Sequence, residues 1–163
     1  MKLGLFSLAC LALIPSACGA ASATTAASTS TGTSGPLVFP LASVEQRVAG
    51  KPVVYLFTAP GCASCADQAQ ALATAAKGRT SVQLVGVDLT NDKPSDFAGY
   101  ICAIGLAESQ FTWTIDEDGG LARRYGIVSL SSSVFIGSDG RVRFVNAGPQ
   151  DARTLDTQLG QLS

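Results

Sequence analysis

The residues most able to do chemistry in this chain are two cysteines separated by two small residues, in Cys62-Ala63-Ser64-Cys65. They follow the apolar run Pro52 to Phe57 and open an alanine-rich stretch that is typical of a helix. The start of a helix leaves backbone N–H groups unpaired and carries a partial positive charge, which favours a thiolate. We therefore predict that Cys62 is the attacking nucleophile. Cys65, one helical turn later, can then resolve a mixed disulfide.

A zinc site is the main alternative for two cysteines at this spacing. Structural zinc takes four ligands, and the chain has five cysteines and no histidine. Cys10 and Cys18 fall near the start of the chain, which leaves Cys102 as the other cysteine of the folded part. Cys102 is expected on a helix, either as a small apolar residue or as a third redox thiol. We predict thiol chemistry with no metal site and no cofactor.

Residues 1–17 predict a signal peptide of the lipoprotein type. Their apolar run is shorter than the roughly 20 residues that span a bilayer, and small residues follow it. Ser16-Ala17-Cys18 is similar to the end of a bacterial lipobox, so Cys18 is expected to receive lipid and become the mature N-terminus. The alternative is cleavage after Ala20 or Ala23 and a soluble secreted or periplasmic protein. The chain is thus predicted to be extracytoplasmic and to meet the membrane through a lipid anchor only.

The rest of the chain divides into a linker and one domain. Residues 18–35 are nearly all Ala, Ser, Thr and Gly, which predicts a flexible tether. Residues 36–163 have the size of a single domain, which we expect to be a monomer. The net charge of −1 and the mixed signs along the chain give no basic stripe, so no nucleic-acid partner and no polybasic membrane patch are predicted.

The elements around the cysteines predict where these residues lie in the fold. A helix is expected over Ser43–Ala49, with Ser43 as its N-cap, before a buried strand over Val53–Phe57. The helix that begins at the two cysteines ends at Lys77-Gly78, and a second buried strand covers Val82–Val87. A strand, a helix and a strand form a right-handed parallel unit, which places the cysteines at the carboxyl edge of the sheet.

The C-terminal half predicts helices and strands in alternation and then a hairpin. Strict apolar alternation, glycine stops and the turn residues Ser138-Asp139-Gly140 mark the boundaries. The expected helices are 94–104, 121–125 and 149–162, and the expected strands are 111–115, 133–136 and 142–145. The fold class is therefore α/β, a central mixed β-sheet flanked by helices, with a C-terminal β-hairpin and helix.

Three segments together resemble the thioredoxin superfamily, in particular the TlpA/ResA type of membrane-tethered thiol-disulfide oxidoreductase. They are Phe57-Thr58-Ala59-Pro60-Gly61-Cys62-Ala63-Ser64-Cys65, then Val85-Gly86-Val87-Asp88, and Tyr125-Gly126-Ile127 with the hairpin from Val134 to Val142. The resemblance implies a thioredoxin-like fold, with extracytoplasmic protein dithiols or disulfides and a membrane electron donor as partners. Ala63-Ser64 offers no histidine or cation to stabilise a thiolate, which favours reduction or isomerisation of disulfides over oxidation.

The approach to the cysteines departs from the family pattern. Pro60 matches the family's proline, but Thr58 and Gly61 stand where the family has tryptophans. We therefore expect Thr58 and Pro60 to support a smaller, more open rim. Leu56 stands where thioredoxin has a buried aspartate that moves protons for the resolving thiol, and Asp88 is a candidate to replace it.

The loop that the family uses to hold its substrate also departs from the pattern. By resemblance this loop contains Leu130 and Ser131, with Ser131 in the place of a cis-proline. A cis bond before a residue other than proline costs about 3 to 4 kcal/mol, so the Leu130–Ser131 bond is expected to be trans. Ser131→Pro is expected to restore the family's loop. The alternative function is a thioredoxin-fold binding module without catalysis, or a thiol metal carrier.

Overall fold

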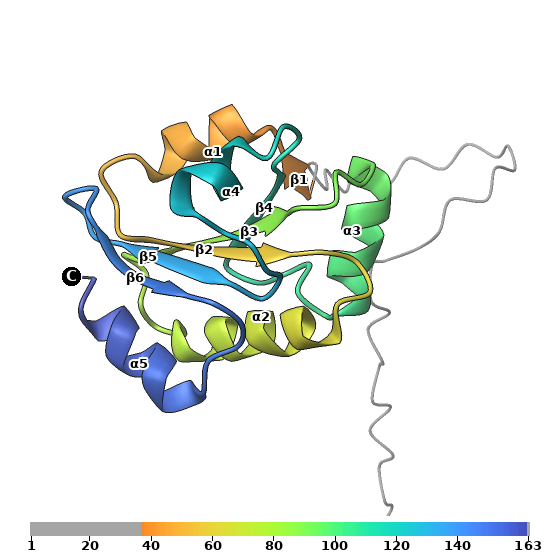
Figure 1. The fold of residues 1–163 in the computed structure, drawn as a ribbon. Coiled ribbons are helices and arrows are strands. Elements are labelled where there is room, and N and C mark those ends of the chain that lie inside the picture. The colour runs from red at the N-terminus through yellow and green to blue at the C-terminus, as the bar shows by residue number, and fades with distance from the viewer. Residues whose placement is uncertain (1–36, 163) are drawn as a thin grey trace, which may run out of the picture. The chain divides into compact units, whose positions relative to one another are not determined.

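The computed structural model describes residues 37–162, which form one mixed sheet covered by helices on both faces (Figure 1). The six strands lie in the order β1-β4-β3-β2-β5-β6. In chain order the elements are β1 (Val38–Phe39), α1 (Leu41–Val48), β2 (Val53–Thr58), α2 (Ala63–Ala75), β3 (Gln83–Asp88), α3 (Pro94–Ala103), β4 (Phe111–Ile115), α4 (Gly120–Tyr125), β5 (Ser133–Ile136), β6 (Val142–Asn146) and α5 (Ala152–Gly160).

The pairing of the central strands fixes where the cysteines lie. Strand β2 runs parallel to β3, with Thr58 opposite Asp88 at their carboxyl ends. Strand β5 runs antiparallel to β2, and β6 antiparallel to β5, so the predicted mixed sheet with a C-terminal hairpin is confirmed. Helix α2 begins five residues after β2 ends, at Ala63. The carboxyl edge of the sheet therefore carries the start of α2.

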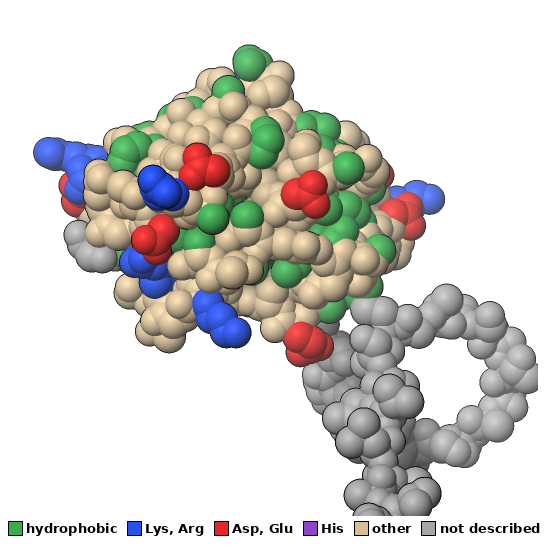
Figure 2. Space-filling view, turned by 90° about the horizontal axis from the view of Figure 1, so that it is seen from below, with side chains coloured by type: hydrophobic (Ala, Val, Ile, Leu, Met, Phe, Trp, Pro, Cys, Tyr) green, Lys and Arg blue, Asp and Glu red, His purple; other side chains and the backbone are tan. Residues whose placement is uncertain are grey.

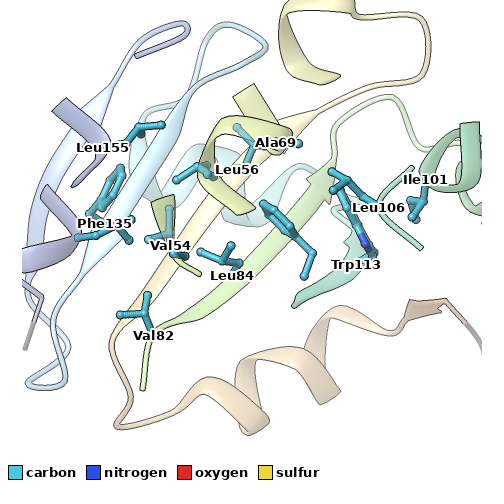
Figure 3. Close-up of a cluster of buried hydrophobic side chains, with 14 of the residues drawn as sticks. Val54, Leu56, Ala69, Val82, Leu84, Ile101, Leu106, Trp113, Phe135 and Leu155 are labelled. Carbon is cyan, nitrogen blue, oxygen red and sulfur yellow. The ribbon is translucent and has the colours of Figure 1, made fainter. Parts of the chain in front are cut away.

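Two apolar cores separate the sheet from its helices. Helices α1 and α4 lie over one face, while α2 and α5 lie over the other, where α3 also packs (Figure 1). The larger core, beneath α2, α3 and α5, contains Leu56, and Figure 3 shows this side chain among apolar neighbours near Ala69 of α2. Leu56, at the position where thioredoxin has a proton-relaying aspartate, is therefore an ordinary core residue in this protein.

The face that carries α2 and α5 has a mixed charge. Figure 2 shows acidic and basic side chains scattered over this face, with no gathering of one sign over the helices. One ion pair of the described part, between Arg79 and Asp156, joins the turn after α2 to α5.

The packing of the Trp113 side chain on the sheet depends on one glycine. Gly86 lies opposite Trp113, and a Cβ atom at Gly86 would lie 2.1 Å from Cε3 of Trp113. The buried indole is held from its other sides by Phe111 and Phe97, with ring centroids 4.8 and 5.8 Å away. We therefore expect Gly86→Ala to lower the free energy of unfolding by about 1 to 3 kcal/mol, because overpacking forces side chains or backbone to shift. Urea unfolding followed by circular dichroism measures this change.

Gly99→Ala is the matched control. Gly99 lies inside helix α3 with open space around its Cα. Alanine there should raise the free energy of unfolding by roughly 0.5 to 1 kcal/mol, because glycine is costly within a helix. A Gly86→Ala variant as stable as the wild type would mean that Trp113 is not confined as the structure describes.

The start of the domain differs from the prediction. Strand β1 was not predicted, because two residues carry no detectable periodicity and are defined by pairing with β4. Helix α1 begins at Leu41 instead of Ser43. The hydroxyl of Ser43 donates to the carbonyl of Pro40 at 2.8 Å, so Ser43 lies in the first turn and is not the N-cap.

The last helix is shorter than predicted, because a capping residue fixes its start. Asp151 is the N-cap of α5, and its carboxylate accepts the backbone N–H of Thr154 at 2.9 Å. This hydrogen bond lowers the pKa of the Asp151 carboxyl. Pro149, where the helix was predicted to begin, lies before the cap.

Candidate redox site

A tight turn carries the chain from β2 to the first cysteine. The backbone N–H of Cys62 donates to the carbonyl of Ala59 at 3.2 Å, and Gly61 has a φ of +80°. Pro60 fixes φ at the second position of the turn, and glycine accepts the positive φ at the third. Pro60 and Gly61 therefore have a defined local role, which is to place Cys62 at the N-cap of α2.

Cys62 and Cys65 form a disulfide across the first turn of α2. Cys62 is partly exposed, whereas Cys65 is fully buried. The backbone N–H of Cys65 donates to Sγ of Cys62 at 3.2 Å, and Oγ of Ser64 lies 3.5 Å from the same sulfur. When the pair is reduced, donors at this position favour the thiolate of Cys62.

The structure brings Ser131 to the cysteine turn. Its side chain is 1% exposed, its backbone N–H donates to the carbonyl of Phe57 at 2.9 Å, and its hydroxyl donates to the carbonyl of Ser64 at 3.0 Å. Leu130 and Val128, by contrast, are 37% and 93% exposed. The loop from Val128 to Ser131 thus lies beside the redox motif and presents apolar side chains to solvent.

The backbone of this loop explains why proline does not fit at position 131. All peptide bonds of residues 37–162 are trans, as expected for Leu130–Ser131. Ser131 has a φ of +62°, in the left-handed region. Proline holds φ near −65° and has no N–H to donate. The expectation that Ser131→Pro restores the family's loop is therefore wrong for this backbone.

Thr58 does not lie on the rim of the site. It is buried at the end of β2, and its hydroxyl pairs with the phenolic oxygen of Tyr100 at 3.2 Å. A small side chain at this position points into the interior, where it meets α3. Burial raises the pKa of Tyr100, although the hydrogen bond between Tyr100 and Thr58 opposes the shift. This contact with Tyr100 could not be predicted from local sequence, because 42 residues separate it from Thr58.

Asp88 is buried at the end of β3 and has a local role. One carboxylate oxygen accepts hydrogen bonds from the backbone N–H and the hydroxyl of Thr90, and the other accepts the N–H of Asp92. These hydrogen bonds hold the loop after β3. They do not go to Cys65, so the geometry gives no support to Asp88 as a replacement for the proton relay.

The other predicted residues lie away from this site or outside the description. Cys102 lies on α3 and is partly buried. Cys18, the signal peptide and the tether fall outside the described residues. Within residues 37–162, no helix is long and apolar enough to cross a membrane, and no three potential metal-ligating side chains gather at one place.

A mixed sheet with a disulfide-forming cysteine pair at the start of the helix after β2 is the arrangement of a thioredoxin-like fold. The chain belongs to the Redoxin family, which its sequence matches over residues 39–159.

Similar proteins agree with this assignment. The chain is 30% identical over 114 residues to the soluble secreted antigen MPT53 of Mycobacterium tuberculosis, a match that covers 70% of this chain and 63% of that protein. A secreted M. tuberculosis disulfide oxidoreductase homologous to E. coli DsbE is 26% identical, with a TM-score of 0.61 over 72% of this chain and 86% of that one. The structure of dsbF from MTB has a TM-score of 0.63 at 24% identity, over 72% and 85% of the two chains. The resemblance to exported thioredoxin-like proteins is confirmed.

Proposed function

We propose that this protein is an exported thiol-disulfide oxidoreductase that reduces or isomerises disulfides of other extracytoplasmic proteins. The observation that carries the proposal is the asymmetry of the cysteine pair. Cys62 is accessible and receives a backbone N–H at its sulfur, while Cys65 is buried one turn along α2. An accessible thiolate can attack a partner, and a buried neighbour can attack only the disulfide formed next to it.

The chemistry balances without a cofactor. The Cys62 thiolate attacks one sulfur of a substrate disulfide, and that disulfide breaks to give a mixed disulfide and a substrate thiolate. Cys65, deprotonated, then attacks Sγ of Cys62. The Cys62–Cys65 disulfide forms and the second substrate thiolate leaves, so the substrate gains two electrons and the enzyme loses two. In isomerisation the released thiolate instead attacks another disulfide of the same substrate, and no net oxidation occurs.

The groups around Cys62 support this direction of electron flow. Its sulfur receives a backbone N–H and lies beside the Ser64 hydroxyl, and no histidine exists in the chain. Neutral donors stabilise a thiolate less than an adjacent cation does, so the reduced form is not strongly favoured. A dithiol of this kind passes electrons on more readily than it accepts them.

Equilibration of the full-length protein with glutathione buffers tests this direction. We expect a reduction potential closer to that of thioredoxin, about −270 mV, than to that of DsbA, about −120 mV. The fraction of oxidised protein is measured by alkylating free thiols and following the Cys62–Cys65 peptide by mass spectrometry. A potential near −120 mV would make the protein an oxidant and overturn the proposed direction.

The exposed loop residues supply a docking surface for an extended protein segment. Val128 and Leu130 lie on the loop that contacts the cysteine turn through Ser131. We expect Val128→Ser to lower kcat/KM for a protein disulfide about 3- to 20-fold, since an exposed apolar contact is removed from the substrate. Reduction of a small disulfide such as oxidised glutathione should stay unchanged. Both rates are measured with the same reduced enzyme.

Val145→Ser is the matched control for the docking surface. Val145 is 52% exposed on β6, a different element from the loop. This variant should leave both rates unchanged. Docking through Val128 would be contradicted by an equal loss of kcat/KM in Val128→Ser and Val145→Ser. A loss of activity toward oxidised glutathione in Val128→Ser would contradict it as well.

Export and membrane attachment form the remaining part of the proposal. Two of the similar proteins are secreted, which supports an extracytoplasmic location for this one. We place the lipid anchor at Cys18, after a signal peptide over residues 1–17, with a membrane protein as the electron donor and the domain as a monomer. Mass spectrometry of the membrane fraction should find a diacylated Cys18, and an unmodified N-terminus at Ala21 or Thr24 would contradict the anchor.

A further inference from the structure

We propose that the hydroxyl of Ser131 is a positioning group for the redox pair, which stabilises its disulfide form and thereby lowers the reduction potential of Cys62–Cys65. The proposal rests on the proposed function in one respect, namely that this pair is the one that reacts. It adds a residue outside the cysteine motif that sets the balance between the oxidised and reduced forms.

The position of the Ser131 hydroxyl is fixed by burial and by two backbone hydrogen bonds of the loop. The residue is almost completely buried, and its backbone N–H donates to the carbonyl of Phe57 at 2.9 Å. The N–H of Phe57 in turn donates to the carbonyl of Ser132 at 2.9 Å. The loop is therefore attached to the end of β2 by two backbone hydrogen bonds, one before and one after the Ser131 side chain.

From this anchored position the hydroxyl reaches into the turn that the disulfide closes. It donates to the carbonyl of Ser64 at 3.0 Å across 67 residues of sequence. Ser64 lies between the two cysteines, and its own hydroxyl is 3.5 Å from Sγ of Cys62. The contact from Ser131 thus acts on the residue that links the backbone of the motif to its attacking sulfur.

The hydrogen bond from Ser131 to Ser64 is present in the disulfide form of the protein. We therefore expect it to stabilise the disulfide form. Reduction breaks the bond between the two sulfurs, which then separate to at least van der Waals contact, so the turn between them must adjust. A donor that holds the Ser64 carbonyl in the arrangement of the disulfide form stabilises that form more than the reduced one. Stabilising the disulfide makes the pair harder to reduce.

Ser132 provides a control within the same loop. It is 2% exposed, close to the value for Ser131, but its hydroxyl donates to the carbonyl of Ser129 at 2.8 Å. Removing the Ser132 hydroxyl therefore deletes a buried hydrogen bond of similar kind that does not touch the cysteine motif. A general loss of loop stability should appear in both variants, whereas an effect on the redox pair should appear only at Ser131.

The experiment compares full-length wild type, Ser131→Ala and Ser132→Ala in glutathione buffers. We expect the equilibrium constant for forming the Cys62–Cys65 disulfide to fall about 2- to 10-fold in Ser131→Ala, the size expected for one neutral hydrogen bond. It should change less than 2-fold in Ser132→Ala. Ser131→Gly, which accepts the positive φ without strain, should show the same fall and serves if the alanine variant does not fold.

The outcomes separate this inference from the proposed direction of electron flow. An unchanged constant in both Ser131 variants, a shift of the opposite sign, or an equal shift in Ser132→Ala would overturn the positioning role. None of these results bears on whether the wild-type protein is a reductant, which depends on its absolute potential. A wild-type potential near that of a strong oxidant would overturn the proposed direction and leave the comparison between variants valid.

Discussion

Cys65→Ser will accumulate mixed disulfides with partner proteins through Cys62, and Cys62→Ser will accumulate none through Cys65. Cys62 is accessible at the start of α2, so it can still attack a partner when its neighbour is serine. Serine at position 65 cannot displace the partner, and the covalent intermediate persists. Cys65 is fully buried, so in the converse variant it does not reach a partner disulfide. Turnover should fall at least about 1,000-fold in both variants, because each lacks one thiol of the reaction.

Trapping is measured by non-reducing electrophoresis and mass spectrometry of variants expressed with their own leader sequence. The double variant Cys62→Ser/Cys65→Ser controls for adventitious adducts at the remaining cysteines. Equal trapping by the two single variants would reverse the assignment of roles. Adducts that persist in the double variant would show that another cysteine carries the reaction.

Ser131→Pro will destabilise the protein by about 2 to 4 kcal/mol. Proline cannot adopt the φ of +62° found at this position, and it removes the N–H that donates to the carbonyl of Phe57. The buried carbonyl then loses a partner, which alone costs about 1 to 3 kcal/mol. The Ser131 hydroxyl that contacts Ser64 is lost as well. Urea unfolding of the oxidised proteins measures the change in the free energy of unfolding.

Ser131→Gly is the control for this prediction, because glycine accepts a positive φ and keeps the backbone N–H. The free energy of unfolding of Ser131→Gly should lie within about 1.5 kcal/mol of the wild-type value, because only the hydroxyl contact is lost. A proline variant as stable as the glycine variant would mean that the loop can adopt another backbone conformation, and that the left-handed conformation of Ser131 is not required.

Much of the fold could be predicted because its elements carry strong local signals. Strands β2 and β3 are continuous apolar runs, and the Ser138-Asp139-Gly140 turn marks the β5–β6 hairpin. Strand β1 was missed because it depends on a partner far away in the sequence: it is two residues long and is defined by pairing with β4. The start of α1 was misplaced for a local reason, because the carbonyl of Pro40 accepts the first N–H groups of the helix.

The redox site shows the same contrast between local signals, which could be predicted, and long-range contacts, which could not. The spacing of Cys62 and Cys65 predicted their place at a helix start, which needs only local sequence. Ser131 could be placed near them by resemblance, but its left-handed backbone and its hydrogen bond to Ser64 could not be predicted. Serine rarely adopts this conformation, and the contact joins segments 67 residues apart. The pairing of Thr58 with Tyr100 was missed for the same reason.

Reduction of insulin by the full-length protein, with dithiothreitol as electron source, is the decisive assay for the proposed activity. We expect catalytic amounts of wild-type protein to speed the precipitation of reduced insulin chains, whereas Cys62→Ser should not raise the rate above that of dithiothreitol alone. A wild-type rate equal to the dithiothreitol background, with the Cys62–Cys65 pair verified as reduced, would contradict the assignment of this protein as a reductase of protein disulfides.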